Sequence, residues 1–176
     1  MKTQKHPASA REFLGITRDI LTSPEFLAMK AVRSHVNGTL YYHSAKVAYL
    51  CYRHYKKRGV DAATLAEVTR AALLHDYYLY DRHQKGAHIK HHWRRHSRIA
   101  LRNAGRDYPG LTERQCDMIA HHMFPVTLRP PRYRAGWMLC LYDKLAAMDD
   151  RFGKKRYKEP SAREEKRVDT TPAHMV

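Results

Sequence analysis

A series of helix-start and helix-end signals, with no strand-like alternation between them, restricts the fold of this chain more than any other feature. Ser23-Pro24-Glu25 has the form of an N-cap residue followed by proline and an early acid. Asp61 is a second N-cap candidate, and Thr112–Gln115 has the pattern of a capping box. Gly59 and Gly105 are suited to end helices. These signals predict an all-α protein.

The apolar spacing between these signals predicts about six helices. They cover approximately residues 24–33, 42–59, 61–76, 89–104, 112–123 and 135–151. The chain has 176 residues, of which 43% are hydrophobic, which suits one domain with a real core. Residues 154–176 are charged and lack periodicity. We therefore predict one helical domain over residues 1–153 and a flexible C-terminal tail over residues 154–176.

The cysteines and the N-terminus indicate a cytoplasmic protein. The three cysteines, Cys51, Cys116 and Cys140, are widely spaced and form no CxxC pair, as expected of reduced thiols. The first residues contain no apolar segment of the kind found in signal peptides. No apolar run approaches the roughly 18 residues that a transmembrane helix needs, so no membrane partner is expected.

The charge is strongly positive. Lys and Arg total 33 against 17 acidic residues, which gives a net charge of +16. Such a field attracts polyanions, whether nucleic acid, nucleotides or anionic lipid. Basic residues are concentrated between Tyr77 and Asp107, where they comprise Arg82, Lys85, Lys90, Arg94, Arg95, Arg98, Arg102 and Arg106. We expect an electropositive approach to any site in this region.

His75 and Asp76 are two adjacent ligand candidates at the end of a predicted apolar helix. Neighbouring helix positions differ by about 100°, so one metal ion lying between the two directions can meet both side chains. Imidazole nitrogen with carboxylate oxygen suits manganese, iron, zinc, nickel or cobalt. The alternative is a helix-end pair that bonds only to the backbone.

Asp143 and His43 are further candidates, because both are expected to face the interior. Asp143 lies in a predicted helix that is apolar nearly all round, which indicates a central helix. A buried carboxylate needs a metal or an ion-pair partner, and an arginine is the alternative to a metal. His43 precedes Val47 and Leu50 at helical spacing. An ordinary core histidine is the alternative reading of His43.

Several other histidines lie between residues 83 and 122. His92 and His96 share one face of a predicted helix, and His121 and His122 end the next one. For His88 and His91 a solvated face is the preferred reading, and His83 is expected in a loop.

The order of a histidine, a His-Asp pair and a late aspartate resembles the HD superfamily of metal-dependent phosphohydrolases. Five segments carry the resemblance, at residues 35–44, 72–81, 96–104, 122–127 and 143–144. They are similar to a branch of small bacterial HD-domain proteins, and the resemblance covers about residues 30–150.

The resemblance implies a role for each matching residue. The first metal ion would be held by His43, His75, Asp76 and Asp143. Asp76 would bridge to a second ion held by His96 and His122, with His92 or His121 as additional candidates. One or two divalent ions are therefore expected. Asp76 and Lys144 are the predicted catalytic residues, with Lys144 neutralising a phosphate oxygen.

Four arginines are candidates for further phosphate contacts, with ordinary surface charge as the alternative. They are Arg33, Arg129, Arg132 and Arg134.

Three functions compete. The first is a phosphohydrolase or phosphodiesterase acting on an anionic, phosphorylated, nucleotide-like small molecule, in which a metal ion activates water. The second is a di-iron oxygenase, which extra histidine ligands would suit. The third is a non-enzymatic basic module that binds nucleic acid, for which the sequence offers charge but no recognised motif. The oligomeric state is not predicted.

Overall fold

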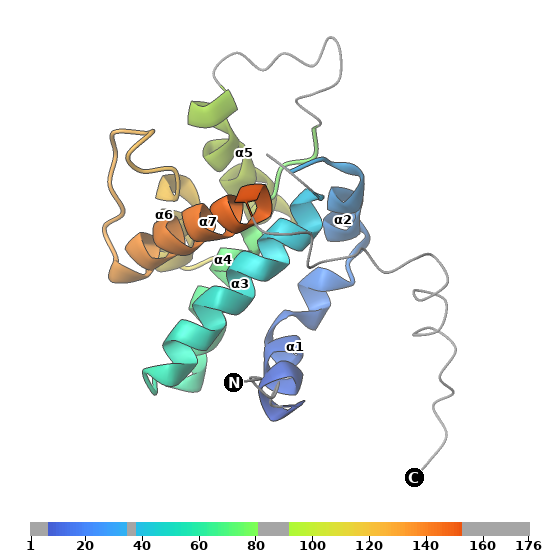
Figure 1. Cartoon of the computed structure of the whole chain (residues 1–176), viewed down its shortest axis with the longest axis vertical. Coiled ribbons are helices and arrows are strands. Elements are labelled where there is room, and N and C mark those ends of the chain that lie inside the picture. Colours follow the sequence, from blue (N-terminus) through green and yellow to red (C-terminus); the bar gives the residue numbers. More distant parts are fainter. Residues whose placement is uncertain (1–6, 35–37, 81–91, 153–176) are drawn as a thin grey trace.

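The computed structural model describes residues 7–34, 38–80 and 92–152, and its regular elements are helices. In chain order these are α1 (Pro7–Leu21), α2 (Pro24–Leu27), the 3-10 helix η1 (Ala28–Ala31), α3 (Leu40–Lys57), α4 (Ala62–Leu74), α5 (His92–Asp107), α6 (Glu113–His121) and α7 (Arg134–Phe152) (Figure 1). Between the described residues the sole β-type pairing is an isolated bridge from Arg33 to Thr39. The predicted all-α class is confirmed.

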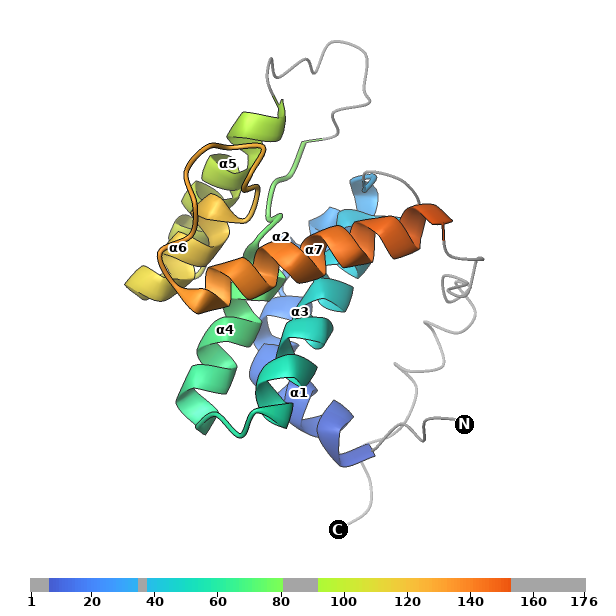
Figure 2. The ribbon, with the colours of Figure 1, turned by 60° about the vertical axis from the view of Figure 1, so that its left-hand side comes forward.

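The helices form a layered bundle around α4. α3 and α4 make an antiparallel hairpin, and α4 also packs against α1, α5 and α6. α5 lies beside α6, and α7 crosses over the hairpin while contacting α3 and α6 (Figure 2). None of the helices within the described ranges combines the length and the hydropathy that a membrane span requires.

The predicted caps form as expected. Ser23 accepts a hydrogen bond from the backbone of Phe26, and Asp61 accepts one from the backbone of Thr64. Thr112 and Gln115 complete a reciprocal capping box at the start of α6. Gly59 adopts a φ of +66°, the left-handed conformation that ends α3 with little strain.

The buried face of α4 explains its central place. Leu65, Val68, Ala72 and Leu73 are almost fully buried, and they face the large side chains that the neighbouring helices contribute. Because so much of α4 is buried, the residues directly after its last turn also lie in the interior. That position is occupied by His75 and Asp76.

The structure departs from the helix predictions in three places. α1 was not predicted at all. The helix predicted over residues 24–33 is two short pieces, α2 and η1, because the backbone is already extended at Val32. α5 does not stop at Gly105 but continues to Asp107. Gly105 takes part in this last turn without a positive φ, so its flexibility is not used to end the helix.

The predicted central position of the last helix is wrong. α7 buries one face through Ala135, Leu139 and Ala146, which lie against the core. The opposite face exposes Trp137, Leu141, Leu145 and Met148, each between 46% and 58%. The apolar residues on two sides predicted burial all round. Instead, this face is only partly covered: Trp137 packs against Phe124 with ring centroids 5.1 Å apart, yet it stays 47% exposed.

Some predictions lie outside the described residues. They include the tail over residues 154–176 and residues 35–37, which begin the first segment that resembles the HD superfamily. They also include His83, His88 and His91 with the neighbouring Arg82, Lys85 and Lys90.

Candidate metal centre

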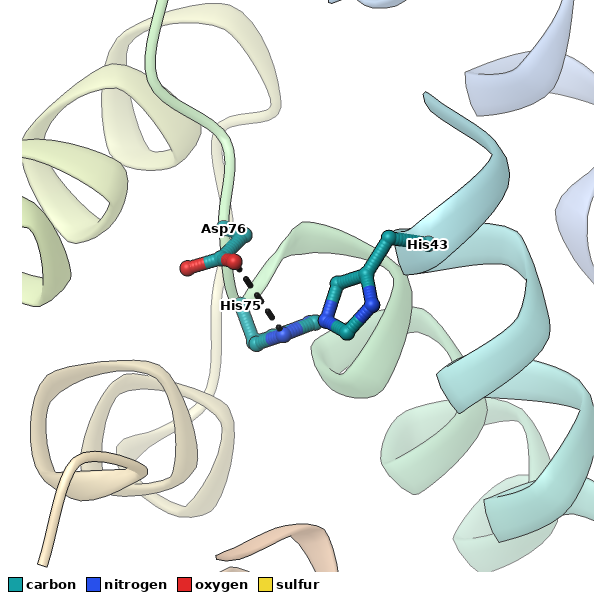
Figure 3. A group of neighbouring side chains, drawn as sticks. All are labelled: His43, His75 and Asp76. Atoms are coloured by element: carbon teal, nitrogen blue, oxygen red, sulfur yellow. Dashed lines mark ion pairs between the residues drawn. The ribbon is translucent and has the colours of Figure 1, made fainter. Parts of the chain in front are cut away.

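His75 and Asp76 follow directly on the last turn of α4, and both are buried (Figure 3). His75 lies 3 residues beyond Ala72, and its Nδ1 donates a hydrogen bond to the Ala72 carbonyl oxygen at 2.8 Å. The Nδ1 hydrogen leaves Nε2 of the neutral ring as a lone-pair donor. The helix end therefore sets both the tautomer and the direction of the ligand atom.

His96 and His122 use the same device. His96 Nδ1 donates to the His92 carbonyl at 3.1 Å, and His122 Nδ1 donates to the Ile119 carbonyl at 2.9 Å. Both rings are buried, and their Nε2 atoms turn inward to lie 3.1 Å apart. If both Nε2 atoms are unprotonated, their lone pairs repel at this separation, and a cation bound beside them would remove the repulsion.

Asp76 lies between the histidines that come from α4, α5 and α6. Its Oδ1 is 3.3 Å from His96 Nε2 and 3.4 Å from His122 Nε2, whereas its Oδ2 is 3.7 Å from His75 Nε2. One carboxylate oxygen thus faces two imidazole nitrogens, and the other faces one. A carboxylate placed in this way can bridge two cations.

His43 and Asp143 complete the group around His75. Asp143 Oδ1 lies 3.0 Å from His43 Nε2 and 3.5 Å from His75 Nε2. α3 provides His43 and α7 provides Asp143, so the crossing of these two helices brings the side chains together. Figure 3 shows the His43 ring directed toward the His75–Asp76 pair.

Asp150 is a site residue that the sequence analysis missed. Its Oδ2 lies 3.3 Å from His43 Nδ1, on the side of the ring away from Asp143, and its other oxygen accepts a hydrogen bond from Lys46. A carboxylate behind a ligating histidine orients the ring and raises its basicity. Asp150 follows Asp143 by two helical turns, and this spacing was the available signal.

The donor set meets the requirements of divalent transition metals. Three groups each have their ligand atoms within 4.8 Å of one another: His43–His75–Asp76, His75–His122–Asp143 and Asp76–His96–His122. His75 Nε2 and Asp76 Oδ1 are buried and have no hydrogen bond of good geometry among the described residues. Such orphaned atoms carry a desolvation penalty that metal coordination removes.

The histidines and carboxylates of this cluster have pKa values shifted in different directions. Although burial opposes it, hydrogen bonding to Asp143 and Asp150 raises the pKa of His43 to about 10, and hydrogen bonding to Asp76 raises that of His96. Burial opposes ionisation of Asp76, but the surrounding His75, His96 and His122 hold the pKa of Asp76 well below its usual range. Burial also opposes ionisation of Asp143, yet hydrogen bonding to His43 and His75 keeps the Asp143 pKa low. Burial lowers the pKa of His122, so this imidazole is neutral and ready to bind a metal.

Two further candidates are placed elsewhere. Lys144 is exposed, and its Nζ donates to the carbonyl oxygens of Phe124 at 2.8 Å and Cys140 at 3.2 Å. The first bond ties α7 to the loop after α6, the second lies within α7, and a phosphate contact would require them to break. His121 pairs with Asp117 at 2.8 Å and does not join the cluster.

His92 lies beside the cluster without entering it. Its ring stacks on that of His96 with centroids 4.8 Å apart, and its Nδ1 bonds to the hydroxyl of Tyr80 at 2.8 Å. None of the ligand groups found within the described part of the chain includes it. His92 therefore packs against one ligand and bonds to the chain that follows Asp76.

The candidate phosphate-binding arginines are dispersed. Arg33 and Arg134 are exposed near the ends of α3 and α7, and the Arg132 guanidinium lies over the Tyr133 ring at 5.7 Å. Arg129 lines a separate pocket together with several arginines of α5.

The comparison with protein families agrees with this centre. The family model described as HD domain matches residues 40–169. The chain belongs to the HD-domain family. The HD match begins at α3 and takes in His43, the His75–Asp76 pair and Asp143, while α1, α2 and η1 precede it. No curated protein and no solved structure shows significant similarity to the chain. HD-domain proteins are mostly metal-dependent phosphohydrolases, which places this chain in a hydrolase-type family.

Proposed function

We propose that this HD-domain protein is a phosphohydrolase with two divalent metal ions, acting on a phosphate ester of a small, nucleotide-like molecule. His43, His75 and Asp143 would hold the first ion, and His96 and His122 the second. Asp76 would bridge the two ions.

The observation that carries the proposal is the position of Asp76. One of its oxygens faces His96 and His122, and the other faces His75, which in turn adjoins Asp143. An ion pair that served only stability would need one cationic partner. Here one buried carboxylate has three imidazoles around it, each with Nε2 directed inward.

The proposed chemistry follows from the donor set. When bound, such ions polarise a phosphoryl oxygen and lower the pKa of water, so that hydrolysis proceeds near neutral pH. The role of the protein is to hold the ligand atoms before the ions arrive. The hydrogen bonds from His75, His96 and His122 to their own helix carbonyls do this, because they fix each ring without any contribution from the metal.

The net charge of +16 supports an anionic substrate. Arg94 and Arg98, which were expected to help attract it, are exposed on α5, whereas His92 and His96 on the same helix are buried. Helix geometry places these arginines on the side away from the ligands. Attraction of an anionic substrate would therefore depend on the electrostatic field of the net positive charge of the whole molecule rather than on these arginines.

The test is metal-dependent turnover. Protein loaded separately with manganese, iron, zinc, nickel or cobalt is assayed against mono-, di- and cyclic nucleotides and generic phosphate mono- and diesters. We expect hydrolysis that chelation abolishes and that Asp76→Asn removes. Asp149→Asn, a control on an exposed carboxylate, retains the activity. A panel without metal-dependent hydrolysis would contradict the proposal.

The group Asp76–His96–His122 is the one specific observation that supports the oxygenase alternative. Two imidazoles and one carboxylate also suit iron. Oxygen-dependent turnover by the iron-loaded protein, with no hydrolysis of any phosphate ester, would favour that alternative.

A further inference from the structure

A pocket of about 650 Å³ lies apart from the metal centre, between α5, α6 and the loop that follows His122. Its volume is in the range of roughly 300–1,000 Å³ that is typical of small-molecule sites. Arg94, Arg95 and Arg98 line it from α5, and Arg129 lines it from the loop. Four arginines therefore line one concave surface.

Some arginines elsewhere on the helices have acidic partners. Arg70 pairs with Asp19, and Arg114 pairs with Glu67. In contrast, the four pocket arginines form no ion pair or hydrogen bond through their side chains to any residue of the described ranges. This leaves the positive charge of the pocket uncompensated by the residues around it.

The nearest acidic group on α6 is already occupied. Asp117 Oδ1 bonds to His121 at 2.8 Å, and its Oδ2 accepts hydrogen bonds from the backbone amides of Arg132 and Tyr133. This carboxylate holds the loop in place and is not directed to the arginines. The loop that carries Arg129 is therefore fixed relative to α6.

Repulsion between the clustered arginines of α5 destabilises this helix, and a bound anion would offset that repulsion. Arg94 and Arg98 are four residues apart, and Arg95 and Arg98 are three apart, so like charges adjoin on the helix surface. Such pairs destabilise a helix by a few tenths of a kcal/mol each. A multivalent anion seated among them would reverse the sign of this interaction, and guanidinium groups bind phosphate oxygens bidentately.

The remaining lining of the pocket combines apolar side chains with the polar residues Ser97, His121 and Thr127. Of the apolar members, Leu101 and Ala120 lie on the helices, and Val126 and Leu128 lie on the loop with exposures of 48% and 89%. A ligand that fits this lining has an apolar body in addition to its negative charge. Inorganic phosphate satisfies only the charged half of the site.

The pocket and the metal centre use different faces of the same helices. On α5, His92, His96 and Ala100 are buried, whereas Arg94 and Arg98 are exposed and line the pocket. His121, which lines the pocket, precedes the ligand His122. We propose that this pocket is a second site, which binds a nucleotide carrying two or more phosphate groups independently of the metal ions.

The experiment measures ATP binding to the full-length protein by calorimetry, with chelator present and salt at about 0.15 M. Wild type and Asp76→Asn should bind ATP alike, because the site needs no metal. This result is independent of any hydrolase activity. Inorganic tripolyphosphate should bind about tenfold more weakly than ATP, because it leaves the apolar side chains of the pocket exposed.

Arg94→Gln/Arg98→Gln should weaken ATP binding by about tenfold or more, and Arg129→Gln, outside the helices, should act in the same direction. Arg11→Gln/Arg18→Gln removes the same charge from exposed positions of α1 and is the matched control. It should change the affinity by no more than about twofold, given screening at this salt concentration.

Several outcomes would overturn the proposal. The proposal is wrong if the wild-type protein does not bind ATP. It is also wrong if Arg94→Gln/Arg98→Gln and the control Arg11→Gln/Arg18→Gln lose affinity equally. Loss in Asp76→Asn would assign the nucleotide to the metal centre. Equal affinity for tripolyphosphate would exclude a nucleotide-specific site. Tighter binding of a single-stranded oligonucleotide, lost in Arg94→Gln/Arg98→Gln, would assign the surface to nucleic acid.

Discussion

At the scale of single residues, the proposed metal centre depends on hydrogen bonds that each candidate ligand forms within its own segment. His75, His96 and His122 each donate Nδ1–H to a carbonyl three or four positions earlier. Because these bonds are local, the tautomer of each ring is set once the helix forms. The long-range packing of α4, α5 and α6 then only has to bring three prepared rings around Asp76.

His43 is held differently, and Asp150 is the residue that its orientation depends on. We expect Asp150→Asn to weaken metal binding by about 10–100-fold, because the amide is a poorer partner for the His43 ring. Asp149→Asn is the control, since Asp149 also bonds to Lys46 but does not contact His43. Competition with a chromophoric chelator measures both affinities. Equal affinities in the two variants would show that Asp150 does not orient His43.

The sequence indicated the residues that cluster around Asp76 better than the residues that orient them. His75 and Asp76 are adjacent in the chain, and the residue pattern and the family resemblance both pointed to His43 and Asp143. Asp150 was missed because its contact with His43 exists only where α7 crosses α3. Lys144 was chosen for its place beside Asp143, but adjacent helix positions point about 100° apart, and its ammonium lies on the outer side.

At the scale of elements, α1 is a structural part of the domain although it precedes the matched region. Its Phe13 is 8% exposed and packs edge-on against Tyr49 and Tyr52 of α3, with centroids 5.3 and 5.6 Å away. Arg70 of α4 pairs with Asp19 and also bonds to the Ile16 carbonyl. α1 thereby covers one side of the α3–α4 hairpin.

We expect Phe13→Ala to lower the free energy of unfolding by about 3 kcal/mol, from lost burial and the cavity left behind. Leu14→Ala removes a neighbouring side chain that is 49% exposed, and should lower it by less than about 1 kcal/mol. Urea unfolding of both variants measures the difference. Similar small losses in the two variants would indicate that α1 is not docked as described.

The starts of α4 and α6 were predicted correctly because caps mark them. Asp61 and Thr112 start helices because their side chains accept backbone hydrogen bonds. The start of α1 at Pro7 follows no such cap candidate in the sequence, and the helix was missed. For α7 the pattern showed which residues are apolar, but only tertiary packing decides which of its faces is covered.

At the scale of the whole molecule, the end of the domain remains a prediction. Periodicity in the sequence ends near Gly153, whereas the HD match runs to residue 169. We expect truncation after Gly153 to leave the melting temperature nearly unchanged, because residues 154–176 show no core-facing pattern. A chain ending at residue 169 is the matched control. A large drop in the shorter chain alone would place the end of the domain beyond residue 153.

The central claim is a two-ion centre bridged by Asp76, and metal stoichiometry tests it most directly. Protein loaded anaerobically with manganese or iron and freed of excess metal is measured by elemental analysis. Wild type should hold about two ions per chain, and His96→Ala and His122→Ala about one each. His121→Ala, adjacent to a ligand but outside the cluster, should still hold about two. A limit of about one ion in wild type, unchanged in His96→Ala and His122→Ala, would contradict the account.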